Sequence, residues 1–494
     1  MGKRMPIFYS ALMLTGVNLL LRFVGTSFQV YLSGRIGAEG IGLLQLTMSV
    51  GVMAMVAGMG GIRTATMYLT AEELGRVRPK NVTWVLSGCV IYSILFSGSV
   101  GLLVYFLAPK IGISWIGNAQ IVGALRLYAV FLPVSCLCGV MTGYFTGANR
   151  IGTLAAVEVV EQLFSMVCTI ALLTFWAGHD PVKSCKAVIL GSCLGACMTL
   201  SALAVLRLKE HAETGTRIPV AGRLAHTALP LALADDLRTG ISTVENLMVP
   251  KRLALYPGTA SALADFGTVS GMVFPVLMFP AAILFGLTEL LIPELARCHA
   301  SGKHNRIRYL VRKSLRVALL YGAHCGGVLF LCAEELGMAL YRSVDAGRYL
   351  KWFSLLAIML YLDAVTDAMI KGLGEQKASV RYNILTNTMD VVFLFVLLPK
   401  FGIFGYFISF LVTHIVNFIL SLRRLLLISQ VRFSPFRASL CLVCTAAAIL
   451  VGSLLDGAWF KGIGFSLIFV CFLFISGVLT KADVHWVKGL VCKK

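Results

Sequence analysis

The sequence predicts an all-α integral membrane protein, because it is too apolar and too poor in charge for a soluble fold. Of its 494 residues, 58% are hydrophobic and only 13% are charged, and the mean hydropathy is +0.85. Soluble globular proteins have about 45–50% apolar and about 25% charged residues. The apolar residues also form long runs, as membrane-spanning helices require. These observations exclude a disordered chain, a disulfide scaffold and an ordinary soluble enzyme.

About fourteen of the apolar runs are long enough to cross a hydrocarbon core of about 30 Å as helices. They lie near 7–32, 41–69, 82–107, 120–146, 153–176, 185–206, 225–249, 266–292, 314–333, 352–370, 383–398, 402–422, 437–455 and 462–480. The loops between them are short, so no separate soluble domain is expected. The first run follows Lys3 and Arg4, as in a signal peptide, but its length predicts a retained span.

The charge distribution predicts the orientation of these spans. The net charge is +20, and most Lys and Arg residues fall in alternate loops, notably 207–223 and 297–316. The positive-inside rule places these loops and both termini in the cytoplasm, which requires an even number of spans. The basic tracts lack interleaved aromatic residues, so a lipid surface rather than a nucleic acid is the expected partner.

The chain carries no signature of catalysis or of a cofactor. It has no P-loop, no Gly-x-Ser-x-Gly and no His-Glu-x-x-His. Most of its 14 cysteines lie in apolar runs, where we expect them to pack as small hydrophobes. We therefore expect a protein that is not an enzyme and that holds neither a cofactor nor a metal.

The spans divide into two halves of similar length and identical predicted topology. Gly75-Arg76 and Gly302-Lys303 occupy matching loops, and Gly147 and Gly374 end matching spans at the same separation. We therefore predict two six-helix lobes in a parallel pseudo-two-fold repeat, as some transporters have. The predicted organisation is an N-lobe (1–207), a cytoplasmic linker (208–223), a C-lobe (224–425), and spans thirteen and fourteen with a cytoplasmic tail (426–494).

Arg22 is the clearest candidate for a binding residue. It lies about 15–22 Å from either end of the first span by helix rise, too deep for its side chain to reach bulk water. Asn18 and Gln29 share its helix face. We predict that these three residues line a central cavity with a cationic site. A structural ion pair with an acid of another span is the alternative.

Further charged residues lie within the second and seventh spans, where each charge costs about 2.5–3.5 kcal/mol. Arg63 is near the end of span two, and Asp235, Asp236, Arg238 and Glu245 form a polar stripe on span seven. We predict that Arg63, Arg238 and Glu245 line the cavity and that the two aspartates are candidates for ion coupling. Asp235 and Arg238 could instead neutralise each other.

Two further features suggest movement and coupling. Span eight contains Pro275 and Pro280, which bend a helix and make it a candidate gating element. Asp363 and Asp367 share one face of span ten, opposite the polar residues of span eleven. These aspartates are candidates for proton or ion coupling, and interhelical hydrogen bonding is the simpler interpretation.

Several short motifs together resemble the polysaccharide-transporter branch of the multidrug/oligosaccharidyl-lipid/polysaccharide (MOP) flippase superfamily. The likeness is to stage V sporulation protein B-like transporters and, more distantly, to lipid II flippases. The motifs are Arg22-Phe-Val-Gly25, Gly34-Arg-Ile-Gly37-Ala-Glu39-Gly40-Ile-Gly42-Leu-Leu-Gln45, Gly143-Tyr-Phe-Thr-Gly147, Glu161-Gln162, Val249-Pro250-Lys251-Arg252-Leu253 and Lys371-Gly-Leu-Gly374. Gly61-Ile62-Arg63 departs from the usual Gly-Ile-Pro, which questions a general role for Arg63.

The resemblance implies two six-helix lobes of the MATE/MOP type, with a central cavity that opens alternately to each side of a bacterial cell membrane. It implies a lipid-linked oligosaccharide cargo, such as an undecaprenyl-pyrophosphate precursor of peptidoglycan or polysaccharide, and a setting in wall synthesis or sporulation. Arg22 matches a pyrophosphate-binding cation, and spans thirteen and fourteen match a groove for the lipid tail. We expect a monomer in the lipid bilayer.

Two other functions stay open on the sequence. A proton- or sodium-coupled multidrug or cation antiporter of the same fold is the first, favoured by Asp235, Asp236 and Glu245, although the first span holds Arg22 and no acid. A membrane-embedded glycosyltransferase is the second, but the acids of the external loops are too scattered to suggest a site.

Overall fold

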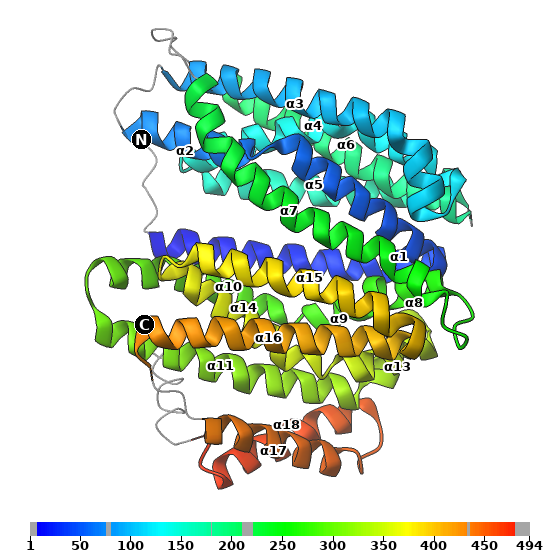
Figure 1. Ribbon diagram of the computed structural model, residues 1–494, viewed down its shortest axis with the longest axis vertical. Coiled ribbons are helices and arrows are strands. Elements are labelled where there is room, and N and C mark those ends of the chain that lie inside the picture. The colour runs from blue at the N-terminus through cyan, green and yellow to red at the C-terminus, as the bar shows by residue number, and fades with distance from the viewer. Residues whose placement is uncertain (1–6, 76–80, 179, 210–220, 432–434, 480–494) are drawn as a thin grey trace. The chain divides into compact units, whose positions relative to one another are not determined.

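The computed structural model describes residues 7–75, 81–178, 180–209, 221–431 and 435–479, and this part of the chain is helical, with no strands (Figure 1). Most of the predicted linker and the C-terminal tail lie outside the described residues. The principal helices of the first half are α1 (Ile7–Met59), α2 (Ile62–Gly75), α3 (Val82–Lys110), α4 (Val122–Gly147), α5 (Ile151–Leu172), α6 (Pro181–Leu208) and α7 (Ala221–Leu253). Those of the second half are α8 (Ala262–Thr268), α9 (Phe274–Met278), α10 (Ala281–Ala300), α11 (His304–Leu331), α12 (Ala333–Tyr341), α13 (Val344–Phe353), α14 (Leu356–Gly372), α15 (Gln376–Phe401), α16 (Ile403–Ser429), α17 (Pro435–Gly452) and α18 (Ala458–Ile475).

The predicted all-α membrane protein is confirmed. Over the described residues, nine helices are long and apolar enough to cross a membrane, or up to eleven if each of two sharply bent pairs is one span. The first two predicted spans merge into one apolar helical run, Leu19–Leu74, interrupted at Gly37, where φ is 71°, and at Gly60–Gly61. Each predicted span coincides with one helix or two successive helices, except 266–292, which covers α8, α9 and α10. The count of fourteen crossings stays a prediction.

The chain divides into two compact units, residues 1–267 and 268–494. In unit 1, α4 packs against α2, α3 and α6, α5 lies on α6, and α7 packs along α1 and α2. A core of buried side chains joins these helices, including Ile62, Val85, Val140 and Phe145. Thus α7 packs with the first six predicted spans, although the sequence repeat assigns it to the C-lobe. The lobe limits drawn from the repeat stay a prediction.

Two glycines allow α4 to touch the backbone of α2. A Cβ at Gly143 would lie 2.4 Å from the carbonyl oxygen of Arg63, and one at Gly147 would lie 2.5 Å from that of Met67. Any side chain at either position would push the helices apart. This small-xxx-small arrangement is how membrane helices approach closely. The Gly143–Gly147 motif therefore fixes the helix that carries Arg63.

An ion-pair cluster joins the start of α7 to the end of α2 in unit 1. The two guanidinium Nη atoms of Arg223 lie 2.8 Å from Glu73 Oε1 and 2.6 Å from Glu72 Oε2. Asn81 Nδ2 donates to the second oxygen of Glu73, at 3.2 Å. The hydrogen bond to Glu73 raises the pKa of Arg223 above its ordinary value, and this effect outweighs burial, which lowers the pKa. The cluster holds the first turn of α7 against the end of α2.

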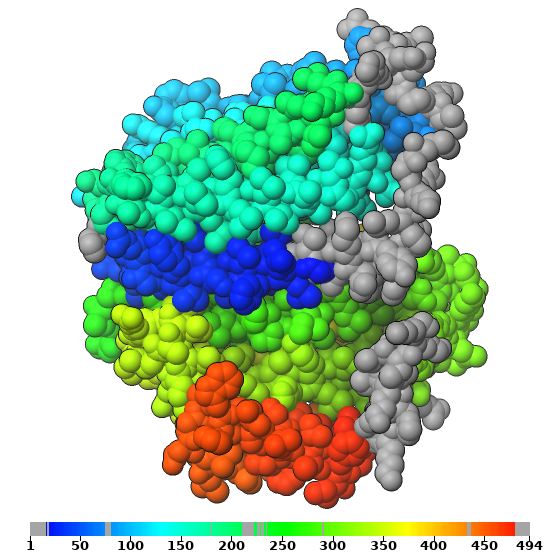
Figure 2. Space-filling model, turned by 180° about the vertical axis from the view of Figure 1, so that it is seen from behind, coloured from blue at the N-terminus to red at the C-terminus, as the bar shows by residue number. Residues whose placement is uncertain are grey.

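In unit 2, α14 lies among α10, α11 and α16, and α15 packs on α16. The α17–α18 hairpin packs on α11 and forms its own ridge on the surface of this unit (Figure 2). Phe465 and Phe469 of α18 stack on each other at 5.6 Å between ring centroids, and His324 of α11 lies against both rings. The α17–α18 hairpin thus shares a hydrophobic cluster with α11.

Pro280 lies at a break between α9 and α10. Proline lacks an amide hydrogen, so the helix loses a hydrogen bond there. Two tyrosines donate to carbonyl groups at this break: the Tyr361 hydroxyl to Leu277 O at 2.7 Å and the Tyr321 hydroxyl to Pro280 O at 2.9 Å. Tyr361 is 1% exposed, so the break is supported from the interior of unit 2. Pro275 lies within α9, and the predicted gating movement stays a prediction.

Candidate functional site

Arg22 lies in α1, on the surface of unit 1. Gln162 of α5 fixes the backbone beside it, because its Nε2 donates to the Leu21 carbonyl at 3.1 Å. A Cβ at Gly25 would lie 3.1 Å from the same nitrogen. The Arg22-Phe-Val-Gly25 and Glu161-Gln162 motifs, far apart in the chain, are therefore in contact. The side chain of Gln29 is half-buried, whereas that of Asn18 lies outside the described part of the structure.

Arg63 is exposed in the first turn of α2, directly after the Gly60–Gly61 break. Glu158 of α5 interacts with it electrostatically. Tyr92 of α3 donates to the Gly60 carbonyl at 3.3 Å and so helps to hold the break. Arg63 thus projects from a glycine-hinged turn with a carboxylate nearby, which matches either a cavity-lining role or a structural pair.

The polar stripe of α7 divides into a docked part and an exposed part. Thr243 Oγ1 lies 3.2 Å from the Ser49 carbonyl, and Asn246 Nδ2 lies 3.1 Å from Ser49 Oγ, so this part is bound to α1. Asp235 and Arg238 are both exposed, and the structure shows no ion pair between these two described side chains. One helical face therefore serves packing and the other stays open to the surroundings.

The remaining acids of that stripe are half-buried. The Oδ1 atom of Asp236 is fully covered and has no hydrogen-bond partner within the described chain, and Tyr92 lies within electrostatic range of it. Glu245 takes part in a further interaction.

Three aspartates of unit 2, Asp363, Asp367 and Asp390, lie between α14, α15 and α16. Asp363 accepts two hydrogen bonds from Asn417 Nδ2, both at 2.9 Å, and its Oδ2 lies 3.2 Å from His414 Nδ1. Asp363 is 8% exposed, so this carboxylate is buried. Burial of such a group is tolerated because the amide and the imidazole supply hydrogen bonds.

Two neighbouring carboxylates are satisfied in the same way. Asp390 of α15 accepts from Ser409 Oγ at 2.5 Å and from Thr413 Oγ1 at 3.4 Å. Asp367 of α14 accepts from Ser379 and pairs with Lys371 Nζ at 2.6 Å. Interhelical hydrogen bonds are thus present, but only Asp367 bonds to span eleven as the sequence suggested, whereas Asp363 and Asp390 bond to α16. Ion coupling at Asp363 and Asp367 stays a prediction.

Sequence reasoning did not predict which groups meet. The Asp363–His414–Asn417 contacts join positions 51 and 54 residues apart, and the two tyrosines at the Pro280 break carry no local signal of that role. The only sequence signal for the acid cluster was polarity within apolar runs. Among the described residues, no group of three or more His, Cys, Asp and Glu side chains could hold a metal ion.

Comparison with known proteins supports this architecture. No family model matches the chain. It is 23% identical over 415 residues to stage V sporulation protein B of Bacillus subtilis (strain 168), an alignment that covers 80% of this chain and 78% of that protein. The predicted resemblance to such proteins is thereby confirmed.

Two solved structures show the same fold. The lipid II flippase MurJ in an inward closed conformation has a TM-score of 0.68 at 14% identity and covers 94% of this chain and 98% of its own. An inward-facing multidrug resistance MATE family transporter of the MOP superfamily has a TM-score of 0.66 at 14% identity and covers 84% of this chain and 99% of its own. The apolar helices and these comparisons show a multi-pass membrane protein with the fold of MOP-superfamily transporters.

Proposed function

We propose that this protein is a flippase that moves a lipid-linked saccharide across the cytoplasmic membrane by alternating access. One observation carries the choice of cargo class: the lipid II flippase fold accounts for 94% of this chain, whereas the MATE transporter fold accounts for 84%. The additional share is comparable in length with the α17–α18 hairpin and the residues after it. We propose that these additional helices contact the lipid tail of the cargo, which a drug transporter does not need to bind.

The charge of the first span supports an anionic cargo. A pyrophosphate group cannot cross hydrocarbon unassisted, because moving an unpaired charge out of water is very unfavourable. The guanidinium of Arg22 offers a planar fork of donors that matches phosphate oxygens. Gln162 holds the adjacent backbone of α1, so the position of this arginine is defined by the packing of α5. We propose Arg22 as the principal pyrophosphate-binding residue, with Gln29 and Arg63 as further lining residues.

The proposal includes the topology. Both termini and the basic loops would lie in the cytoplasm, and the protein would act as a monomer without a cofactor. The cargo would be an undecaprenyl-pyrophosphate-linked precursor of peptidoglycan or of another polysaccharide. The similarity to a sporulation protein supports a role in wall synthesis during sporulation.

The test is transport of fluorescently labelled lipid II in liposomes that contain the full-length protein. Arg22→Ala should reduce the initial flipping rate about 10-fold, as expected for the loss of one charge-assisted contact, and Arg22→Lys should fall between the two. Arg126→Ala is the matched control, because Arg126 is an exposed arginine of α4 whose guanidinium already lies 5.1 Å from the Tyr105 ring centroid. If Arg22→Ala flips lipid II at the wild-type rate, Arg22 is not the pyrophosphate-binding residue. Absence of flipping by the wild type would remove the cargo.

A second candidate is a proton- or sodium-coupled antiporter for organic cations with the same fold. The buried Asp363 beside His414 and Asn417 favours it, since a carboxylate with an imidazole neighbour can exchange a proton. The same liposomes distinguish the two functions. Accumulation of a fluorescent organic cation driven by a proton or sodium gradient, without lipid II flipping, would establish the antiporter instead.

A further inference from the structure

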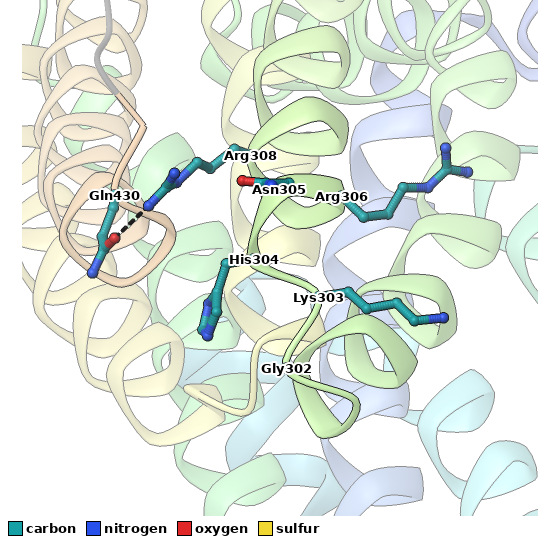
Figure 3. A pocket seen from close by; sticks show the side chains of 7 residues that line it. All are labelled: Gly302, Lys303, His304, Asn305, Arg306, Arg308 and Gln430. Carbon is teal, nitrogen blue, oxygen red and sulfur yellow. Dashed lines mark hydrogen bonds between the residues drawn. The ribbon is translucent and has the colours of Figure 1, made fainter.

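The turn between α10 and α11 forms an open pocket of about 600 Å³ on unit 2 (Figure 3). Its side chains come from the start of α11 and from the end of α16, and include Lys303, His304, Arg306, Arg308 and Gln430. No acidic side chain lines it. A pocket with this lining is a site of concentrated positive charge.

The side chains divide between two sides of the turn. Arg308 points towards Gln430, and its Nη2 donates to Gln430 Oε1 at 2.6 Å. His304 lies one helical turn earlier on that side, while Lys303 and Arg306 point the other way (Figure 3). Arg306 lies 3.7 Å from Glu294, so its charge is partly balanced. The Nε of Arg308 is covered and has no hydrogen-bond partner in the described part of the chain.

These cations lie at the end of α11 where the helix itself disfavours them. The helix has Lys303 as its N-cap without a side-chain cap, and its first turn contains no acid. The N-terminus of a helix carries partial positive charge and unpaired N–H groups, so cations there are destabilising and anions are stabilising. At the other side of the same turn, Arg297 and His299 end α10, where the dipole favours cations.

We propose that this pocket is a binding site for a phosphate-bearing anion, held by the side chains of Arg308 and His304 at the N-terminus of α11. Arginine and helix N-termini are both suited to phosphate oxygens. The volume lies within the range of about 300–1,000 Å³ typical of small-molecule sites. The anion is either the headgroup of an anionic lipid beside the helix end or a soluble phosphate compound. The site is separate from Arg22 and does not depend on the proposed cargo.

The experiment uses the full-length protein in a neutral detergent. One arm titrates a fluorescent short-chain phosphatidic acid, a second measures binding of radiolabelled inorganic phosphate by equilibrium dialysis, and phosphatidylcholine with the same label is the zwitterionic control. The double variant Arg308→Gln with His304→Gln should bind phosphatidic acid about 10-fold more weakly than the wild type. Arg297→Gln is the matched control, since it removes one charge from the same turn outside the pocket, and it should change the affinity less than about 2-fold.

The outcomes are distinct. Saturable binding of phosphatidic acid alone identifies a lipid headgroup site, and binding of both probes identifies a general phosphate site. Equal weakening by Arg297→Gln and by the double variant would show unspecific attraction to net charge and overturn the proposal, as would absence of saturable binding to the wild type. Size-exclusion profiles and recovery of affinity in Arg308→Lys guard against a folding defect.

Discussion

Charged side chains within the helices are accommodated in opposite ways in the two units. In unit 1 the arginines Arg22, Arg63 and Arg238 are exposed on the surface of their unit. In unit 2, Asp363 and Asp390 are 8% and 5% exposed and are enclosed by hydrogen-bond donors from α16. These guanidinium groups are therefore accessible from outside their unit, whereas the two carboxylates are enclosed by partners that the fold supplies.

This difference bears directly on function. A guanidinium at the surface of a membrane helix needs water, a headgroup or a charged cargo as its partner. A carboxylate within the bundle is hydrogen-bonded by other side chains of the folded protein, so its removal should mainly lower the stability of the fold. The proposed function places substrate contact in unit 1, and the enclosed Asp363 and Asp390 predict a stabilising role in unit 2, which the following variants test.

The largest expected effect on stability is that of Asp363→Ala. The substitution leaves the Asn417 amide and the His414 ring without their acceptor inside the bundle, which should lower the free energy of unfolding by about 1–3 kcal/mol. Thermal unfolding in detergent measures it. Asp235→Ala is the control from unit 1, where the carboxylate is exposed, and should change stability by no more than about 0.5 kcal/mol. Equal losses in the two variants would contradict the contrast between the units.

A smaller effect is expected for Tyr361→Phe, which tests an uncharged buried contact of unit 2. The variant keeps the ring and removes only the hydroxyl that donates to the Leu277 carbonyl. Loss of that hydrogen bond at the Pro280 break should lower the free energy of unfolding by about 1 kcal/mol. Amide hydrogen exchange measured by mass spectrometry should become faster over 276–283. Unchanged exchange there would show that the break does not need this support.

The smallest effect is expected at an ion pair near the surface of unit 2. This pair tests whether the size of the effect depends on enclosure or on the unit that holds the residues. Glu335 of α12 accepts a hydrogen bond from Lys461 at 2.6 Å. Burial raises the pKa of Glu335, but the hydrogen bond and charge of Lys461 outweigh it and bring the pKa below its ordinary value of 4.5. A lowered pKa in the folded state means that the stabilisation is present above about pH 4.5 and is lost as the pH falls through the lower folded value.

Glu335→Gln should therefore lower the free energy of unfolding by about 0.5 kcal/mol at neutral pH and by nothing measurable well below pH 4.5. Thermal unfolding of both proteins across this pH range measures the difference. A difference that persists at the acidic end would exclude the ion pair as its cause.

Composition and hydropathy were sufficient to predict the fold class and the position of nearly every helix. Apolar runs such as 82–107 and 185–206 became α3 and α6, because a membrane span must satisfy its backbone hydrogen bonds internally and so must be helical. Gly143 and Gly147 were noted only as part of a repeat and a motif, and the structure shows their close contact with α2. The polar positions within these runs were also identifiable as candidate site residues.

Only the tertiary structure decided which of these polar residues meet. The Arg223 pair with Glu73 spans 150 residues of chain, and the Asp363 pair with Asn417 spans 54. Helical periodicity determines which residues share a face of one helix, but it contains no information on which other helix that face meets. The sequence alone therefore determined that the chain is a bundle of membrane helices bearing buried charge. The packing of the helices decided that Asp363 and Asp390 are enclosed while Arg22 stays at the surface of unit 1, because enclosure depends on neighbours distant in the chain.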